Sequence, residues 1–515
     1  MIERQIVIGL ITSTEFIQQI KPIWNIAYIT SNVAKTLSLW CFEYYDKYNE
    51  APKENIESIF YAKVKQGTLQ KEIAEEIEED ILPDLSDTFE ETSFNLPYAV
   101  DSCKKYFKEQ ALTQHKDQIE GALSEGDLTK AEGFALNYTI SSIDNCRKDI
   151  DLSSEEGLKH VANAFKELSK PLFHFPKALG QFLNEYLVRD SLIGFMGKEK
   201  IGKTFFLILL AMTARKQGKK VAFFEAGDMS ENQLLKRIGI YLTKNSDKKK
   251  YCGKMYEPVA DCVYNQLNAC DKKERECDYG IFETETEKYI RNEITQKEII
   301  EAYKENPDYS PCHNCRAYKS GRMGAVWVKE VEVKDVLTVE RAVDAYKEFF
   351  TKHKRSFKLA CYPMSTLSVK EMKGMLHIWE KEDGFVPDVI ICDYADLLVA
   401  NNTSSQPRDQ QNEIWKNLRN VSQEKHCCVI TGTQADSKSY KQDRLGMGNF
   451  NEDKRKLGHV TAMFGLNQDK KGREKELGIM VLNEIAIREG DSSVKREVKV
   501  LQNLRRGRPF IGSFW

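Results

Sequence analysis

The sequence lacks the segments that carry a chain into or across a membrane. Its first ten residues, MIERQIVIGL, contain no basic stretch followed by an apolar one, so we expect no signal peptide. The longest apolar run, residues 205–214, is about half of the roughly 20 residues that a membrane span needs. We therefore expect a cytoplasmic protein without membrane contacts, in which the 13 cysteines are free thiols or metal ligands and not disulfides.

The sequence also lacks a strong excess of charge of either sign. Its 76 lysines and arginines and 78 aspartates and glutamates give a net charge of -2. A surface that binds nucleic acid must therefore be a local patch. Internal repeats and long low-complexity tracts are missing too. A chain of 515 residues, 41% of them hydrophobic, is typical of a globular protein with two or three domains.

Three segments differ in their hydrophobic pattern. Residues 1–148 carry long charged helical patterns and few strand signals, which predicts an all-helical amino-terminal domain. Residues 149–175 predict a linker helix with one apolar face, and that face packs either on its own domain or on a neighbouring subunit. In residues 176–515, short apolar runs alternate with helical stretches. This alternation predicts an α/β domain with a mostly parallel sheet.

A phosphate-binding pattern opens the α/β segment. Residues 197–204, GKEKIGKT, match G-x-x-x-x-G-K-[ST] at every fixed position, with an apolar strand before them and an apolar helix after them. Gly197 and Gly202 would let the backbone curl so that its N–H groups face phosphates. Lys203 would reach the β- and γ-phosphates, and Thr204 would hold Mg²⁺. The pattern predicts ATP and Mg²⁺ as cofactors.

Acidic residues follow two further apolar runs. Residues 389–393, VIICD, predict a buried strand that ends at Asp393, where a carboxylate would bind the Mg²⁺ shell. The run at residues 221–224 is followed by Glu225 and Asp228. Either carboxylate is able to polarise an attacking water, and the residues alone leave this choice open.

In their order along the chain, these motifs resemble the DnaB-type replicative helicases, whose motor is a RecA-like P-loop ATPase. Residues 223–230, FFEAGDMS, stand where the family has a phrase like F-F-S-L-E-M-S. Residues 391–398, ICDYADLL, match a strand that ends in I-D-Y, and residues 429–434, VITGTQ, match one that ends in S-Q. The likeness covers about residues 175–515, and residues 34–53 resemble the family's helical amino-terminal domain. It implies ATP-driven unwinding of DNA.

The resemblance implies roles for the matching acids and amides. Lys203, Thr204 and Asp393 take the phosphate and Mg²⁺ roles. Gln434 resembles the residue that senses the γ-phosphate. Asp228 aligns with the family's catalytic glutamate when the following Met-Ser pair is the anchor, and we prefer it to Glu225. Asp228 departs from the family, because its side chain is one methylene shorter and an extra residue precedes the anchor.

The carboxy-terminal phrase at residues 503–507, NLRRG, resembles the family's K-x-R-N-G. In the family, its lysine and arginine reach into a neighbour's ATP site. Arg505 matches the arginine finger, whereas Asn503 replaces the lysine. An arginine finger stabilises charge on the transferred phosphoryl group. If Arg505 acts in a neighbour's site, the active form is a homo-oligomer, which the resemblance implies to be a hexameric ring.

The segment after Gln434 is the expected contact with single-stranded DNA, because the family's DNA-binding loops follow this residue. Residues 436–456 contain six lysines and arginines against four acids, together with glycines typical of a loop. The alternative is an ordinary solvated loop. The predicted DNA-binding residues are Lys438, Lys441, Arg444, Lys454 and Arg455. A primase or a helicase loader stays open as a further partner.

A cysteine-rich insertion interrupts the α/β pattern at residues 246–334. It holds six cysteines, and its C-x-x-C pair at 312 and 315 is the usual half-site for tetrahedral Zn²⁺. We expect Zn²⁺ to anchor a segment that is too polar to fold around a core of its own. A redox dithiol and free thiols are the alternatives. The predicted ligands are Cys262, Cys270, Cys312 and Cys315, with Cys277 as a substitute.

The sequence therefore predicts a replicative DNA helicase, a ring that translocates on single-stranded DNA. The cysteine module and the altered motifs resemble a bacteriophage version. Two other classes stay open. One is a RecA-type recombinase or regulatory ATPase that binds DNA without unwinding it. The other is a loader or scaffold whose nucleotide only switches its conformation.

Overall fold

The chain divides into two units, Met1–Lys159 and His160–Trp515, which are described separately. The computed structural model describes residues 2–67, 69–82, 95–128, 130–131, 134, 152–167, 170–270, 294–312, 324–351, 356–400, 406–450, 454–488, 493 and 495–515. Cys277 and Cys315 lie outside these ranges. Residues 135–151, which include the predicted boundary between the amino-terminal domain and the linker, also lie outside them.

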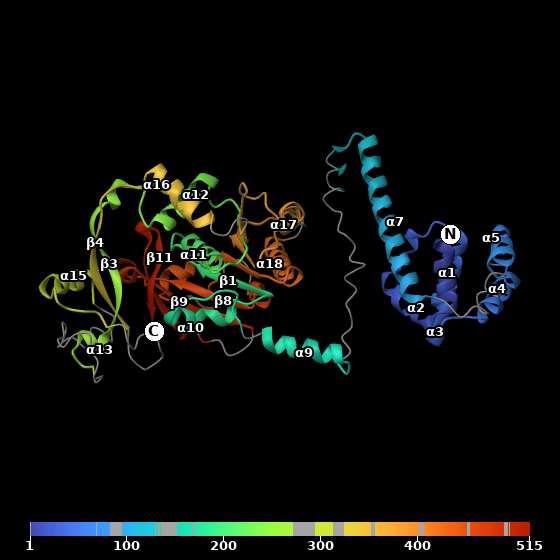
Figure 1. The fold of residues 1–515 in the computed structure, drawn as a ribbon, viewed down its shortest axis with the longest axis horizontal. Helices are drawn as coiled ribbons and strands as arrows, with labels where there is room; N and C mark the ends of the chain where they lie inside the picture. The colour runs from blue at the N-terminus through green and yellow to red at the C-terminus, as the bar shows by residue number, and fades with distance from the viewer. Residues whose placement is uncertain are drawn as a thin grey trace. The chain divides into compact units, whose positions relative to one another are not determined.

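The described residues of the amino-terminal unit form helices and no strand, as the sequence predicts (Figure 1). Their apolar faces meet in one core, where the rings of Phe16, Phe60 and Phe107 are buried. The helices are α1 (Ile2–Thr12), α2 (Thr14–Ile20), α3 (Asn32–Tyr48), α4 (Asn55–Lys65), α5 (Lys71–Glu76) and α7 (Leu96–Ser124).

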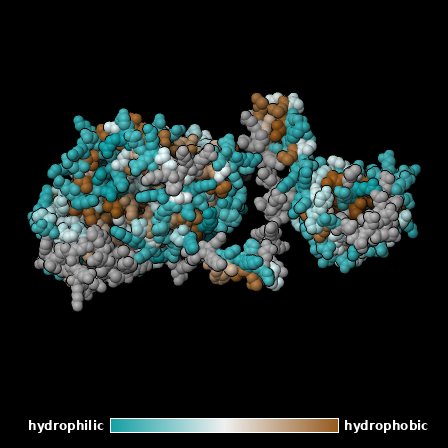
Figure 2. Space-filling model, in the orientation of Figure 1, coloured by the Kyte–Doolittle hydropathy of each residue, from teal (hydrophilic) through white to brown (hydrophobic). Residues whose placement is uncertain are grey.

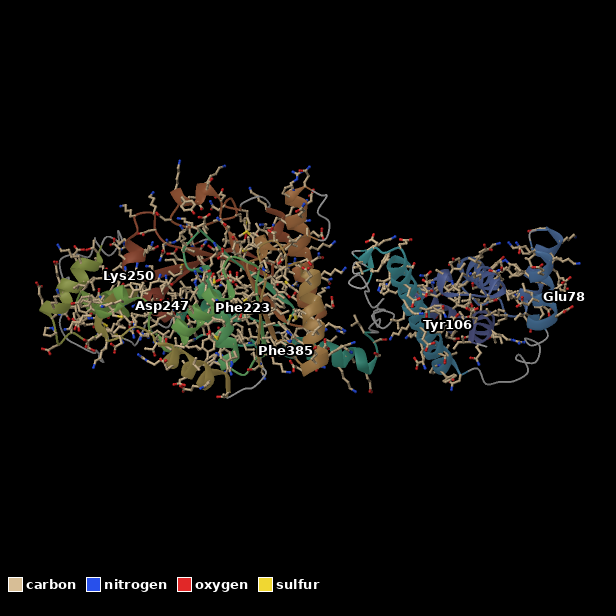
Figure 3. The ribbon with its side chains drawn as sticks, turned by 90° about the horizontal axis from the view of Figure 1, so that it is seen from above. Glu78, Tyr106, Phe223, Asp247, Lys250 and Phe385 are labelled. Carbon is tan, nitrogen blue, oxygen red and sulfur yellow. The ribbon has the colours of Figure 1, made fainter. Side chains whose placement is uncertain are left out.

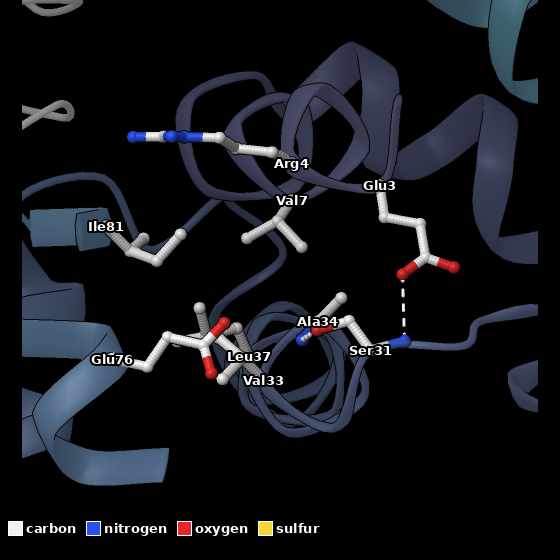
Figure 4. A pocket seen from close by; sticks show the side chains of 9 residues that line it. All are labelled: Glu3, Arg4, Val7, Ser31, Val33, Ala34, Leu37, Glu76 and Ile81. Atoms are coloured by element: carbon white, nitrogen blue, oxygen red, sulfur yellow. Dashed lines mark hydrogen bonds between the residues drawn. The ribbon is translucent and has the colours of Figure 1, made fainter. Parts of the chain in front are cut away.

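A carboxylate on α1 holds the start of α3 in place. Glu3 accepts hydrogen bonds from the backbone N–H groups of Thr30 and Ser31, at 2.6 and 2.9 Å, and from the hydroxyl of Tyr106. Burial opposes ionisation of Glu3, but these hydrogen bonds outweigh it and lower its pKa. Figure 4 shows Glu3 beside a pocket of about 220 Å³ between α1 and α3. Its carboxylate is therefore a structural group of this unit.

A nine-stranded mixed sheet forms the centre of the second unit, in the order β11-β10-β9-β8-β1-β7-β6-β2-β5. The six strands from β8 to β5 are parallel, and β9 to β11 continue the sheet antiparallel. The prediction of a mostly parallel sheet is confirmed. The strands are β1 (Ser191–Gly197), β2 (Val221–Glu225), β5 (Phe357–Cys361), β6 (Val389–Asp393), β7 (Cys428–Gln434), β8 (Ala462–Asn467), β9 (Ile479–Ile487), β10 (Glu497–Asn503) and β11 (Arg508–Phe514).

Both faces of this sheet are covered by helices, so its central strands are apolar on both sides. Phe223 on β2 points into one layer and Phe224 into the other, and Figure 3 shows Phe223 in the interior. The first layer contains α10 (Lys177–Leu183), α11 (Lys203–Lys216), α12 (Glu231–Thr243) and α16 (Val339–Thr351). The second contains α17 (Val369–Asp383) and α18 (Pro407–Glu424).

The cysteine-rich insertion is an antiparallel ribbon of β3 (Gly253–Cys262) and β4 (Gly324–Val333), with the short helices α13 (Val263–Gln266) and α15 (Gln296–Glu305). Figure 1 shows the ribbon beside the β11 edge of the main sheet. Trp327 on β4 shares one apolar cluster with Leu501 and Phe514 of the main sheet. The insertion therefore shares an apolar cluster with the edge of the main sheet, in line with the expectation that it has no core of its own, and its anchoring by Zn²⁺ stays a prediction.

The predicted linker helix is α9 (Glu155–Glu167), and it spans the division between the units. Three apolar residues of this helix are exposed, namely Leu158, Val161 and Phe165, the last by 77%. Figure 2 shows apolar surface on this helix. A helix with an uncovered apolar face is typical of one that packs against another surface.

Among the described residues, no helix combines the length and the apolar composition that crossing a membrane requires. The apolar run at residues 205–214 instead belongs to α11, which is buried against the sheet. Its hydrophobic character is therefore explained by the core of the second unit.

Candidate functional site

The turn between β1 and α11 is built for glycine. Gly202 has φ +103°, a value that other residues adopt only with strain. A Cβ at Gly202 would lie 2.8 Å from Cδ1 of Leu504, and one at Gly197 would lie 3.0 Å from Cγ2 of Ile201. The loop therefore curls tightly into the amino terminus of α11, where unpaired backbone N–H groups attract anions.

Lys203 lies at the mouth of this loop. Its Nζ donates to the carbonyl oxygens of Gly197 and Lys198, at 3.0 and 3.2 Å, and stands 5.7 Å from the ring centre of Tyr394. Burial lowers the pKa of Lys203, while four nearby carboxylates, led by that of Asp393, act in the opposite direction. The Lys203 ammonium group is therefore held against the glycine loop, beside the place where a bound anion would lie.

Asp393 ends β6 and is 1% exposed. Neither of its carboxylate oxygens has a hydrogen-bond partner among the described residues. Burial raises its pKa. The Thr204 hydroxyl beside it lowers the pKa, although no hydrogen bond of normal geometry joins them. An unpartnered carboxylate next to a hydroxyl is the oxygen donor set that Mg²⁺ prefers. The residues present therefore fit the predicted magnesium site.

The two candidate catalytic carboxylates have different surroundings. Glu225 is fully buried. In the register of the neighbouring parallel strands β2 and β6, it lies opposite Asp393. Its Oε1 accepts from the backbone N–H groups of Asp228 and Met229, at 2.9 and 3.2 Å, while its Oε2 has no partner among the described residues. Burial raises the pKa of Glu225, and Asp393 raises it further. The Asp228 side chain is exposed, and its charge raises the pKa of Lys203 and Asp393. Because Glu225 accepts from the N–H groups of Asp228 and Met229, it holds the turn that presents Asp228.

Gln434 ends β7, opposite Gly197 of β1. Its Nε2 donates to Oε1 of Glu199 in the phosphate loop at 2.6 Å, and its backbone N–H donates to Oδ2 of Asp396 at 2.8 Å. The predicted sensor is therefore linked to the phosphate loop through its amide.

Asp396 is a functional candidate that the sequence reasoning missed. Besides the Gln434 N–H, it accepts from the Thr433 hydroxyl at 2.7 Å and from Nζ of Lys456 at 2.7 Å. Lys456 is 1% exposed and lies over the ring of Trp415. Asp396 thus joins the end of β7 to the end of the predicted DNA-binding segment. Asp396 lies three residues after Asp393, within the ICDYADLL motif, and this position was the signal that could have identified it.

Arg505 lies in a loop that the insertion fixes. Fully buried Glu257 on β3 accepts from Arg506 and Arg508, at 2.8 and 2.5 Å, and from the amide of Asn503 at 3.3 Å. Arg505 is exposed, with its guanidinium 5.7 Å from the ring centre of an insertion tyrosine. Asn503, which replaces the family's lysine, therefore has a structural contact, whereas Arg505 is exposed.

The predicted DNA-binding residues fall into two groups. Arg444 donates to Glu474 at 2.8 Å and to Glu497 at 2.6 Å, and Arg455 pairs with Asp409 at 2.7 Å. The other three, Lys438, Lys441 and Lys454, are exposed. These three lysines are therefore exposed, whereas Arg444 is bonded inside the fold.

Two of the predicted zinc ligands are brought together. The backbone N–H groups of Cys262 and Cys312 both donate to Oδ1 of Asp261, at 2.7 and 2.8 Å. Burial raises the pKa of the Cys262 thiol. Cys270 is half-buried, and Cys315 lies outside the described residues. Within the described ranges, no three His, Cys, Asp or Glu side chains are grouped to hold a metal, so zinc stays a prediction.

The fold has a counterpart among solved structures. A DnaB-like replicative helicase, described with its interactions with primase, matches over 98% of this chain and 98% of its own. The two are 12% identical, with a TM-score of 0.54. A second solved structure, an ATPase domain, matches over 70% of this chain and 98% of its own, at 13% identity and a TM-score of 0.43. No protein-family model and no curated protein sequence matches the chain. The first comparison supports the predicted α/β P-loop ATPase fold, while the zinc-binding insertion stays a prediction.

Proposed function

We propose that this chain is an ATP-dependent DNA helicase, a motor that hydrolyses ATP to translocate on single-stranded DNA. The observation that carries the proposal is the meeting of Lys203, Thr204 and Asp393 at the mouth of one glycine loop. An unpartnered buried carboxylate beside a confined lysine is costly in a folded protein, and such sites are commonly functional.

Each residue of this mouth would act on the nucleotide. Lys203 and the loop N–H groups would bind the β- and γ-phosphates, while Thr204 and Asp393 would hold Mg²⁺. The bound Mg²⁺ would neutralise charge on the transferred phosphoryl group. Asp228 would orient the attacking water and accept its proton, as ADP leaves from the γ-phosphorus. Gln434 would exchange its bond to Glu199 for one to the γ-phosphate.

We further propose that the motor is a ring of identical subunits, hexameric as the resemblance implies, with Arg505 completing a neighbour's site. The exposed position of Arg505 and the uncovered apolar face of α9 support this assembly. The exposed Lys438 and Lys441 would contact the DNA backbone. The solved helicase is described with primase, so a primase or a loader is a proposed partner.

A forked duplex with one labelled strand tests the helicase proposal. We expect ATP-dependent strand displacement by the wild-type chain and none by Lys203→Ala, with Lys200→Gln in the same loop as the active control. DNA-stimulated hydrolysis without displacement, for tails of either polarity, would leave the recombinase or regulatory ATPase. Turnover that is unchanged by Arg505→Ala would favour a nucleotide-switched loader or scaffold.

We also propose that the insertion holds one structural Zn²⁺ through Cys262, Cys312, Cys315 and Cys270. The shared contact of two of these cysteines with buried Asp261 supports it, because such backbone contacts orient metal ligands. Metal analysis should find about one Zn²⁺ per chain. The Cys312→Ser variant should lose it and Cys252→Ser, a cysteine of the same insertion, should keep it. A well-folded wild-type chain without metal would contradict the proposal.

A further inference from the structure

A second pocket opens at the carboxyl end of α11, away from the glycine loop. It has a volume of about 720 Å³ and lies between α11, α12, α16 and the start of β11. Lys203 at the other end of α11 is about 18 Å away, at 1.5 Å per residue. The volume lies within the roughly 300–1,000 Å³ that is usual for small-molecule sites.

Arg215 lines this pocket and is 2% exposed. Its Nε and Nη2 are enclosed, and neither donates a hydrogen bond to a described residue. The guanidinium lies 4.5 Å from the ring centre of Phe349 and 5.0 Å from that of Phe350. These rings contact the face of the cation, but a ring face accepts none of the hydrogen bonds that the guanidinium edge donates. No carboxylate pairs with Arg215 in the part of the chain that the structure describes.

This arrangement is unfavourable unless something completes it. An arginine keeps its charge in a protein, and an enclosed donor without an acceptor destabilises the fold. Burial lowers the pKa of Arg215, which reflects the same unfavourable environment. By contrast, Arg506 and Arg508 in the same unit reach the carboxylate of Glu257. Unlike these half-buried arginines, Arg215 is enclosed and has no carboxylate partner among the described residues.

We propose that this pocket binds a small ligand that carries an oxyanion, a phosphate or a carboxylate, on an apolar body, and that Arg215 recognises the anion. The fork of a guanidinium matches the two oxygens of either group. Lys216 and Lys244 add positive charge to the lining, which also holds one carboxylate, that of Glu348. Tyr241 and Phe510 supply apolar wall for the rest of the ligand. The site is separate from the proposed nucleotide site and does not depend on it.

The test uses the full chain with Lys203→Ala, so that the nucleotide site does not contribute. The probes are inorganic phosphate, adenosine monophosphate and benzoate, which separate a phosphate from a carboxylate and a free anion from one on an apolar body. We expect at least one probe to raise the melting temperature saturably, because a ligand of the folded state stabilises it. Adding Arg215→Met should weaken this binding by about tenfold or more.

Two controls keep the result specific. Arg341→Met, an exposed arginine of α16 outside the pocket, should leave probe binding unchanged. Without any probe, Arg215→Met should melt no lower than its parent, because it removes an unpaired buried charge. If Arg215→Met fails to fold, Arg215→Lys keeps the charge, loses the fork and should also weaken binding. The proposal is overturned if no probe acts through Arg215, or if Arg215→Met lowers the melting temperature without a probe.

Discussion

The nucleotide site and the loop segment at residues 436–456 both concentrate charge, but they differ in what the charges contact. Around the glycine loop, Asp393 is buried with both oxygens unpartnered among the described residues, and Lys203 finds only loop carbonyl oxygens and an aromatic ring there. In the loop segment, Arg444 and Lys456 are bonded to carboxylates of the same chain. Groups left unpaired at an energetic cost indicate a ligand, whereas paired groups hold the fold together.

This contrast changes how the positive charge of the loop segment is interpreted. Counted along the sequence, its lysines and arginines are equivalent. In the structure, Arg444 is part of an internal ion-pair cluster, while Lys438 and Lys441 are exposed. Only the exposed lysines would add favourably to binding of a phosphate backbone, because Arg444 would first have to leave its partners.

The largest expected effect concerns the two carboxylates of the nucleotide site. Asp228→Asn should lower ATP turnover by about 10²- to 10⁴-fold, because it removes the proposed base. Glu225→Gln keeps an acceptor for the turn and should lower turnover much less. Steady-state hydrolysis with saturating Mg²⁺ measures both. A greater loss in Glu225→Gln than in Asp228→Asn would exchange their roles.

A second prediction concerns the pairing of Arg506 and Arg508 with Glu257. Glu257→Gln should reduce turnover of the assembled protein by about tenfold, because a loosened loop misplaces Arg505. In an Arg505→Ala background, the same change should have little further effect, since the proposed finger is already absent. Glu330→Gln, which breaks an exposed ion pair on the same ribbon, is the control. Additive losses in the double variant would separate Glu257 from Arg505.

The loop segment itself gives the third prediction. Arg444→Ala should lower the free energy of unfolding by about 3 kcal/mol, because it leaves the buried carboxylate of Glu474 unpaired. Lys438→Ala and Lys441→Ala should change it by less than about 0.5 kcal/mol. Each should instead reduce the salt dependence of single-stranded DNA binding by about 0.7 in the log–log slope. Denaturant unfolding and salt titrations measure these effects, and the reverse pattern would break the comparison.

The fourth prediction is a pH dependence of stability. Burial raises the pKa of Glu225 and Asp393, so the folded state binds more protons than the unfolded state above their ordinary values near 4. The stability without ligand should therefore fall as pH rises from about 4 toward the raised values. For a single group that is protonated only in the folded state, the fall is about 1.4 kcal/mol per pH unit. Asp393→Asn should reduce the slope of the free energy of unfolding against pH, measured by denaturant unfolding at several pH values. An unchanged slope would mean that Asp393 does not cause the pH dependence of stability.

The sequence was sufficient to predict those strands and loops that carry a strong local signal. Gly202, Lys203 and Asp393 were identifiable because a phosphate loop requires fixed spacing and a buried strand requires continuous apolar residues. Asp396 and Glu257 were missed, because their roles depend on partners about 40 to 250 positions away in the chain. The same limit applies to Arg444, whose carboxylate partners Glu474 and Glu497 lie 30 and 53 positions further along the chain. Spacing in a sequence indicates which residues share a turn, but not which distant charges meet.

The most direct test of the central claim is an equilibrium titration of a non-hydrolysable ATP analogue, with and without Mg²⁺. We expect the wild-type chain to bind the analogue and to bind it more tightly when Mg²⁺ is added. Lys203→Ala should lose most of the binding, and Asp393→Asn should bind without any gain from Mg²⁺. A wild-type chain that does not bind the analogue, or an Asp393→Asn variant with an undiminished gain from Mg²⁺, would contradict the account.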